Sequence, residues 1–389
     1  MLTVLIFLLV LTLVVLVHEA GHFFVAKWSG MKVYEFGWGF PPRAFGFYKD
    51  PVTKKIVWVR GGQKGNLHEV AGGTETVEEF PATLYSVNWL PLGGFVKIKG
   101  ENDHNAGADS FAAKSRPKRL ATLLAGVIMN YLLAAVLLGA GFMYGLPANV
   151  TGLDDPNAII VKPAEVMVQG VEPESPAAKA GVKPGDIVLA LDGEKVPSTE
   201  KLITKVRENG TEEIIVLELK RGEEILFREV KPVAAKEGDV PRLGVVLADA
   251  GIVRYPWYMA IAKGFTSAAF GIINIFTSFY ILIKGLITGT GGSMAISGPV
   301  GIAVAVGESA RLGFNYLINI TAMISLSLAA MNVLPIPALD GGRVLFVLIE
   351  SVFRKKVPAK IEQIVHAVGF VLLLGLILVI TWRDIAALL

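Results

Sequence analysis

Long apolar stretches are the feature that most limits what this chain can fold into. A bilayer core of about 30 Å is crossed by a helix of about 20 apolar residues. Four stretches meet this length, at about residues 2–25, 120–145, 314–339 and 364–382. A fifth, 265–287, is apolar but contains Lys284, Asn274 and several small residues. The sequence therefore predicts a polytopic α-helical membrane protein with four transmembrane helices.

The composition agrees with a membrane protein and removes other classes. Hydrophobic residues make up 53% of the 389 residues and charged residues only 18%, against about 25% charged in soluble domains. The net charge of +3, with no basic tract interleaved with aromatics, argues against nucleic-acid binding. Because cysteine is absent, any metal must be held by histidine, carboxylate or backbone oxygen. The first stretch lacks the basic start and cleavage site of a signal peptide, so we expect it to remain.

Basic residues predict the orientation of the spans, because Lys and Arg favour the cytoplasmic side. They follow the first stretch, precede the second and separate the last two: Lys27, Lys32, Lys114, Arg116, Lys118, Arg119, Arg343, Arg354, Lys355, Lys356 and Lys360. This places residues 27–119 and 341–363 in the cytoplasm. Residues 146–313 and both termini would lie outside.

The first span contains His18-Glu19-Ala20-Gly21-His22. Ionisable residues inside a membrane are costly and indicate function. Two histidines four residues apart share one helix face and can hold one zinc ion, while the adjacent glutamate acts on water. The alternative is a pair of polar residues reaching the inner interface.

A catalytic zinc usually has three protein ligands, so a third is expected elsewhere. Asp340 follows Asn332-Val333-Leu334-Pro335-Ile336-Pro337-Ala338-Leu339, where the prolines should break the helix. Irregular backbone at membrane depth is tolerated where it lines a site. Asp340 reaches the depth of the histidines only if 265–287 does not cross, so we predict an outer interfacial helix there. The alternatives are a capping role for Asp340 and His366 as the ligand.

These two motifs resemble the site-2 intramembrane metalloproteases, and the bacterial regulator-of-sigma-E protease branch fits best. Further likenesses lie in Gly37-Trp38-Gly39-Phe40 and Pro91-Leu92-Gly93-Gly94-Phe95-Val96-Lys97, which are similar to that branch's membrane-associated β-loop. Residues 111–130 resemble its second span, and Ser297-Gly298-Pro299-Val300-Gly301 the segment before its third. The resemblance covers most of the chain. It departs in carrying one PDZ-like domain where some relatives have two, and in the loop 48–90.

The resemblance implies a zinc metalloendopeptidase of the bacterial cytoplasmic membrane. Its substrates would be single-span membrane proteins, such as anti-sigma factors already cut by another protease, and remnant signal peptides. The implied zinc ligands are His18, His22 and Asp340, with Glu19 as general acid and base. Asn332 would lie near the scissile carbonyl, where its amide could stabilise an oxyanion or instead join two helices. The expected substrate-binding residues are Gly37, Gly39, Gly93, Gly94, Phe95, Pro335 and Pro337.

Two regions between the spans predict binding surfaces. Within the loop 27–119, residues 31–60 and 84–99 are rich in β-formers and should form membrane-associated hairpins. Strands around 37–40 and 93–97 could hold an extended substrate by strand addition. An amphipathic hairpin on the membrane is the alternative. Residues 146–250, with a core at 165–235, alternate short strands with turns and are similar to a PDZ domain. A peptide-binding role and a size filter for substrates both remain open.

In chain order, the expected parts are a first helix with the histidines (1–26), the cytoplasmic loop (27–119) and a second helix (120–145). The PDZ-like domain (146–250) follows, then the interfacial region (251–313) and two further helices (314–342 and 364–382). Two rival functions are alternatives to the protease. A membrane-anchored peptide-binding scaffold with a structural or inactive metal site would need a closed, usually four-ligand site. A metal transporter would need ionisable residues strung along a path.

Overall fold

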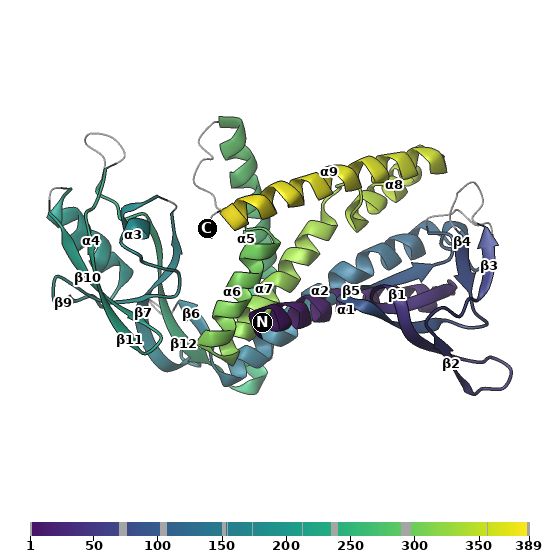
Figure 1. Ribbon diagram of the computed structural model, residues 1–389, viewed down its shortest axis with the longest axis horizontal. Coiled ribbons are helices and arrows are strands. Elements are labelled where there is room, and N and C mark those ends of the chain that lie inside the picture. The colour runs from purple at the N-terminus through teal and green to yellow at the C-terminus, as the bar shows by residue number, and fades with distance from the viewer. Residues whose placement is uncertain are drawn as a thin grey trace.

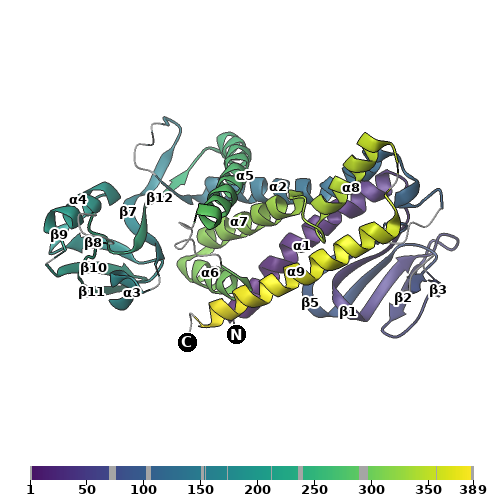
Figure 2. The same cartoon turned by 90° about the horizontal axis from the view of Figure 1, so that it is seen from above.

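The computed structural model describes residues 2–69, 76–101, 107–149, 153, 155–172, 174–211, 213–234, 240–288, 297–355 and 357–386. Within these residues, five helices are long and apolar enough to cross a membrane, one more than expected: α1 (Leu2–Trp28), α2 (Arg116–Tyr144), α5 (Trp257–Thr288), α7 (Phe314–Val333) and α9 (Ala359–Ala386). Length and composition therefore do not confirm the count of four. The additional candidate, α5, stands steeply across the other four helices (Figures 1 and 2).

Helix α2 is the centre of the helical body. It packs against α1, α5 and α7, and half of its most apolar window is buried. Glycines allow two of these helices to approach closely. A Cβ at Gly21 of α1 would lie 2.4 Å from the Ala125 carbonyl oxygen, and one at Gly264 of α5 would lie 2.4 Å from that of Ala135. Small residues commonly let membrane helices meet backbone to backbone in this way.

A sheet at the C-terminal end of α1 is formed by β1 (Val33–Lys49), β2 (Ile56–Arg60) and β5 (Leu84–Ile98). Strands β1 and β5 each fold back on themselves, so Gly37 lies opposite both Phe95 and Ser86. The first half of β1 is therefore internal. Among the described strands, the second half of β5 forms one edge of this sheet. Beside it lie the pair β3 (Asn66–Glu69) and β4 (Thr76–Glu79) and the short helix η1 (Phe111–Ala113).

A second sheet forms a separate domain whose strands run in the order β11-β10-β8-β7-β12-β6, with β9 paired to β8. Helix α4 (Thr199–Asn209) covers it, and Leu202 and Val206 enter a core with Ile215 and Leu219. The last strand continues four residues beyond the expected limit at 250. The remaining elements are β6 (Leu146–Asn149), β7 (Ile159–Val171), α3 (Pro176–Lys179), β8 (Ile187–Leu191), β9 (Glu194–Lys195), β10 (Ile215–Arg221), β11 (Glu224–Val230) and β12 (Val245–Arg254).

The two sheets lie at opposite ends of the helical body, and the start of α1 and the end of α9 both lie at the end nearer the second sheet (Figures 1 and 2). Helix α1 runs from that end to the first sheet. The site motifs on α1 are therefore far from the second domain along the helix axis.

The third span was predicted at 314–342, and its predicted end at residue 342 is wrong. Helix α6 (Pro299–Leu312) precedes α7, which ends at Val333, and α8 (Asp340–Phe353) begins at Asp340, where a loop was expected. The cause is Pro335, which disfavours helical backbone in the residue before it. Leu334 accordingly has an extended ψ of 140°. Six non-helical residues therefore carry the chain to Asp340.

Candidate metal centre

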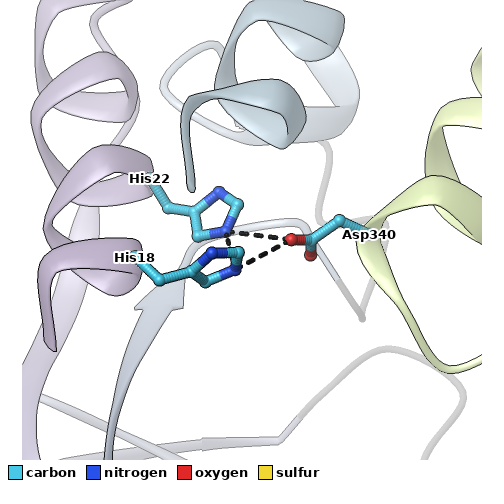
Figure 3. A group of neighbouring side chains, drawn as sticks. All are labelled: His18, His22 and Asp340. Atoms are coloured by element: carbon cyan, nitrogen blue, oxygen red, sulfur yellow. Dashed lines mark hydrogen bonds and ion pairs between the residues drawn. The ribbon is translucent and has the colours of Figure 1, made fainter. Parts of the chain in front are cut away.

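His18, His22 and Asp340 converge on one point (Figure 3). The Nε2 atoms of the two histidines are 3.1 Å apart, and they lie 3.0 and 3.2 Å from Oδ2 of Asp340. Tetrahedral zinc with ligand bonds of about 2.0–2.2 Å would separate its ligand atoms by about 3.3 Å. Both histidines are buried and Asp340 is partly buried. The three donors therefore fit one zinc ion.

The two histidine rings of α1 pack against α2 at Gly126, which has no side chain. A Cβ added there would lie 2.5 Å from His22 Nε2 and 2.6 Å from His18 Cε1. Real Cβ atoms do not approach so closely, so any larger residue here would displace the two rings.

Helix α2 also contacts the Nδ1 atom of each ring, which faces away from the point where the three side chains meet. His22 Nδ1 lies 2.8 Å from the Thr122 carbonyl oxygen, and His18 Nδ1 lies 3.3 Å from the Asn130 side-chain amide. Thr122, Gly126 and Asn130 are spaced by four residues and form one stripe. This stripe was not among the residues predicted from the sequence. Its signal was an amide inside an apolar span, with a spacing that matches the two histidines.

Asp340 is brought inward by the non-helical segment before it. Ala338 has a left-handed φ of 75°, and its N–H donates to His366 Nδ1 of α9 at 2.9 Å. Pro337 packs so closely on α9 that a Cβ at Gly369 would lie 2.3 Å from it. Pro335 and Pro337 thus shape the turn that precedes Asp340. His366 lies outside the three-residue cluster, and its Nδ1 is occupied by the loop.

Two ion pairs anchor α8, which begins at Asp340. Arg119 of α2 and Glu350 are both buried and lie 2.6 Å apart. The second carboxylate oxygen of Glu350 accepts the Val357 N–H at 3.2 Å. Closer to the site, Arg343 pairs with Glu101, which follows β5. The position of Asp340 therefore depends on side chains from α2 and from the segment after β5.

Glu19 and Asn332 differ in their relation to the cluster. The Glu19 carboxylate lies near His22 and Asp340 and faces the backbone N–H of Val96 in β5. The amide nitrogen of Asn332 donates to the Leu328 carbonyl oxygen in the preceding turn of α7 at 3.1 Å. In the described residues, no hydrogen bond joins Asn332 to the two histidines.

The sheet edge expected at residues 37–40 is not free. Gly37 is paired on both sides, and the carbonyl oxygen of Gly39 accepts from Asn88 Nδ2 at 3.0 Å. The expectation for Gly37 and Gly39 as substrate-facing backbone was wrong, because β1 folds back between the two halves of β5.

The other predicted edge does lie beside α1. A Cβ at Gly93 would be 3.1 Å from Val15, and one at Gly94 would be 2.8 Å from Leu16. Phe95 is the next residue on the same strand. The segment 93–95 therefore runs within one turn of His18.

Comparison with known proteins gives the family. The model of peptidase family M50 matches residues 6–63 and 76–376. A relative from Clostridium perfringens is 33% identical over 97% of each chain. The regulator of sigma-W protease RasP from Bacillus subtilis is 30% identical over 98% of each chain, and the zinc metalloprotease RasP from Geobacillus kaustophilus is 29% identical over 97% of this chain and 96% of its own.

A solved PDZ domain of an SdrC-like protein from Listeria monocytogenes matches 23% of this chain and 93% of its own, with 22% identity and a TM-score of 0.21.

The family match covers most of the chain, and the relatives match it from end to end. The chain belongs to peptidase family M50 and is a site-2 type zinc metalloprotease.

Proposed function

We propose that this protein cleaves single-span membrane proteins at the inner end of its helical body, near the cytoplasmic face of a bacterial membrane. The observation that carries the proposal is the convergence of His18, His22 and Asp340 at the end of an apolar helix. The fit of these three donors to one zinc ion supports a metal centre with one coordination position left open. An open position is what distinguishes a catalytic zinc site from a structural one.

His18, His22 and Asp340 hold the zinc ion in this proposal, and Glu19 handles the proton. When bound, zinc acidifies water and polarises a carbonyl group. The Glu19 carboxylate accepts a proton from the attacking water and delivers it to the leaving amine. Its position between the cluster and β5 supports this role.

Asn332 supplies an oxyanion donor in this proposal. Its amide nitrogen carries two N–H groups, and one of them is used by Leu328 within α7. Its burial in the last turn of α7, directly before the segment that leads to Asp340, supports the assignment.

The substrate lies extended against the second half of β5. A helix hides its amides in internal hydrogen bonds, so a protease must present backbone partners to an unwound segment. Residues 93–97 form a sheet edge beside α1, and Glu19 faces the N–H of Val96 in that strand. The neighbouring turn at Pro335 and Pro337 would border the same space.

The termini and the second domain lie outside the cell in this proposal, and the first sheet lies inside. The separation of the two sheets to opposite ends of the helical body supports this orientation (Figure 2).

Helix α5 lies along the outer membrane surface rather than across it. Its steep angle to the other candidate spans supports that placement (Figure 1).

The second domain selects substrates, as a peptide-binding PDZ-like module or as a size filter. Residues 245–248 of β12 pair with β7, while β6 pairs only with residues 250–253. A cavity of about 350 Å³ beside this stretch is lined by Leu202, Val206 and Val245. Among the described strands, the other edge of β12 at 245–248 has no partner, and a strand edge next to a helix favours peptide binding by strand addition. Anti-sigma factors and remnant signal peptides are the proposed substrates, and the name of the Bacillus subtilis relative supports the first.

The test is cleavage of a panel of single-span peptides by purified protein in detergent. Removal of a general base costs about 100- to 10,000-fold in rate. Glu19→Gln should lose cleavage on that scale while holding the same amount of zinc as the unmodified protein. Glu308→Gln, the same change on α6, is the matched control and should cut normally. Equal cutting by Glu19→Gln and the unmodified protein would remove Glu19 from the mechanism.

A further inference from the structure

We propose that Asn130 is a positioning residue for His18. Its amide oxygen accepts a hydrogen bond from His18 Nδ1–H and so holds Nε2 of that ring toward the metal. This inference rests on the proposed role of His18 as a zinc ligand.

The first step is the protonation of the ring. A neutral imidazole carries one proton, and a ring that binds metal through Nε2 must carry that proton on Nδ1. His18 Nε2 is the atom that faces His22 and Asp340. Its Nδ1–H therefore needs an acceptor, because a buried donor without one is costly.

The second step is the identity of that acceptor. His22 meets the same need through the main-chain oxygen of Thr122. For His18 Nδ1, the hydrogen-bond partner in the described part of the chain is the Asn130 side chain at 3.3 Å. Asn130 has no exposed surface, so water does not compete for this position.

The third step is the orientation of the amide. A half-turn about the Asn130 Cβ–Cγ bond exchanges its oxygen and nitrogen, and a protonated Nδ1 is satisfied only by the oxygen. In the present orientation, Oδ1 has no hydrogen-bond partner among the described residues, and the nitrogen faces the ring. Zinc binding therefore selects the orientation in which Oδ1 faces His18.

The fourth step is the anchoring of Asn130 itself. Ser325 Oγ of α7 donates to the main-chain oxygen of Asn130 at 2.8 Å. Asn130 thus joins α1, α2 and α7 directly behind the metal centre. Groups behind a metal-bound histidine fix its tautomer and ring orientation, and their loss typically weakens metal binding about 10- to 100-fold.

The test measures zinc affinity by competition with a chelator, alongside peptide cleavage. Asn130→Leu keeps the volume and removes the acceptor, so its zinc affinity should fall about 10- to 100-fold. Asn130→Asp keeps an acceptor and should bind zinc at least as tightly as the unmodified protein. Asn319→Leu, the same change elsewhere on a membrane helix, is the matched control and should not alter zinc affinity.

Unchanged zinc affinity in Asn130→Leu would overturn the proposal. So would a loss in Asn130→Asp as large as in Asn130→Leu, since packing and not the hydrogen bond would then be responsible. If Asn130→Leu does not fold, the aspartate variant decides alone, and weaker binding by about tenfold counts against the role. His18→Ala in the same assay separates this outcome from failure of the proposed metal site, because it should abolish binding only if His18 is a ligand.

Discussion

The histidines and the aspartate meet at one point but reach it by different routes. His18 and His22 are four residues apart on the unbroken helix α1, so their relation is set by helix geometry alone. Asp340 is the first residue of α8 and follows six non-helical residues. The histidine side of the centre is local in the sequence, whereas the aspartate side is assembled from distant parts of the chain.

The two sides are also held by different kinds of contact. On the histidine side, α2 approaches the rings at Gly126 and offers the main-chain oxygen of Thr122. On the aspartate side, α8 and the preceding turn are held by side chains, through the Arg119–Glu350 pair and His366. The difference suggests that the histidine side is most sensitive to added volume. The aspartate side should be most sensitive to loss of a remote partner.

The largest effect should come from breaking the anchor of the aspartate side. Glu350→Leu leaves Arg119 charged and buried, and removal of one partner of such a pair typically costs about 3–5 kcal/mol of folding stability. The double variant Arg119→Met/Glu350→Leu removes both charges and should recover most of this loss. The measurement is the free energy of unfolding in detergent.

Lys99→Met is the control for that experiment, because the Lys99–Asp109 pair is also close, at 2.8 Å, but the aspartate is about half exposed. Exposed pairs contribute about 1 kcal/mol or less. A loss in Glu350→Leu no larger than in Lys99→Met would mean that α8 is held by packing alone.

A smaller effect should follow from adding volume on the histidine side. Gly126→Ala places a methyl group within 2.7 Å of both ligand rings, and overpacking of this kind costs about 1–3 kcal/mol. If the cost falls on the ligands, zinc affinity drops about 5- to 150-fold at 1.4 kcal/mol per factor of ten. Gly375→Ala on α9 is the control, since its added Cβ would meet nothing within 4 Å. Equal zinc affinity in the two variants would contradict the close approach of α2.

The histidine side could be predicted from the sequence because its geometry is periodic. His18 and His22 needed only a helix, and the helix followed from the apolar stretch. The break before Asp340 could also be predicted, because Pro335 and Pro337 act on neighbouring backbone. The helical start at Asp340 itself was missed, since α8 is stabilised by Arg119 more than 200 positions earlier.

The edge of the sheet formed by β1, β2 and β5 could not be predicted from the sequence. Residues 33–40 and 91–98 both have strand composition, and nothing local distinguishes an internal strand from an edge strand. The fold-back of β1 and β5 made Gly37 internal and left the strand at Gly94 at the edge. Likewise, length and composition place α5 among the five candidate spans, whereas its angle to the other helices is set by tertiary packing.

The smallest effect should come from His366, which holds the turn before Asp340 through one hydrogen bond. His366→Phe keeps a ring against Phe346 but removes the acceptor for the Ala338 N–H. One such bond is worth about 1 kcal/mol, so zinc affinity should fall about fivefold. His366→Gln can still accept this bond and should recover part of the loss. Chelator competition measures both variants beside Gly126→Ala. If His366→Phe lost more zinc affinity than Gly126→Ala, the turn and not the approach of α2 would be the more demanding part of the centre.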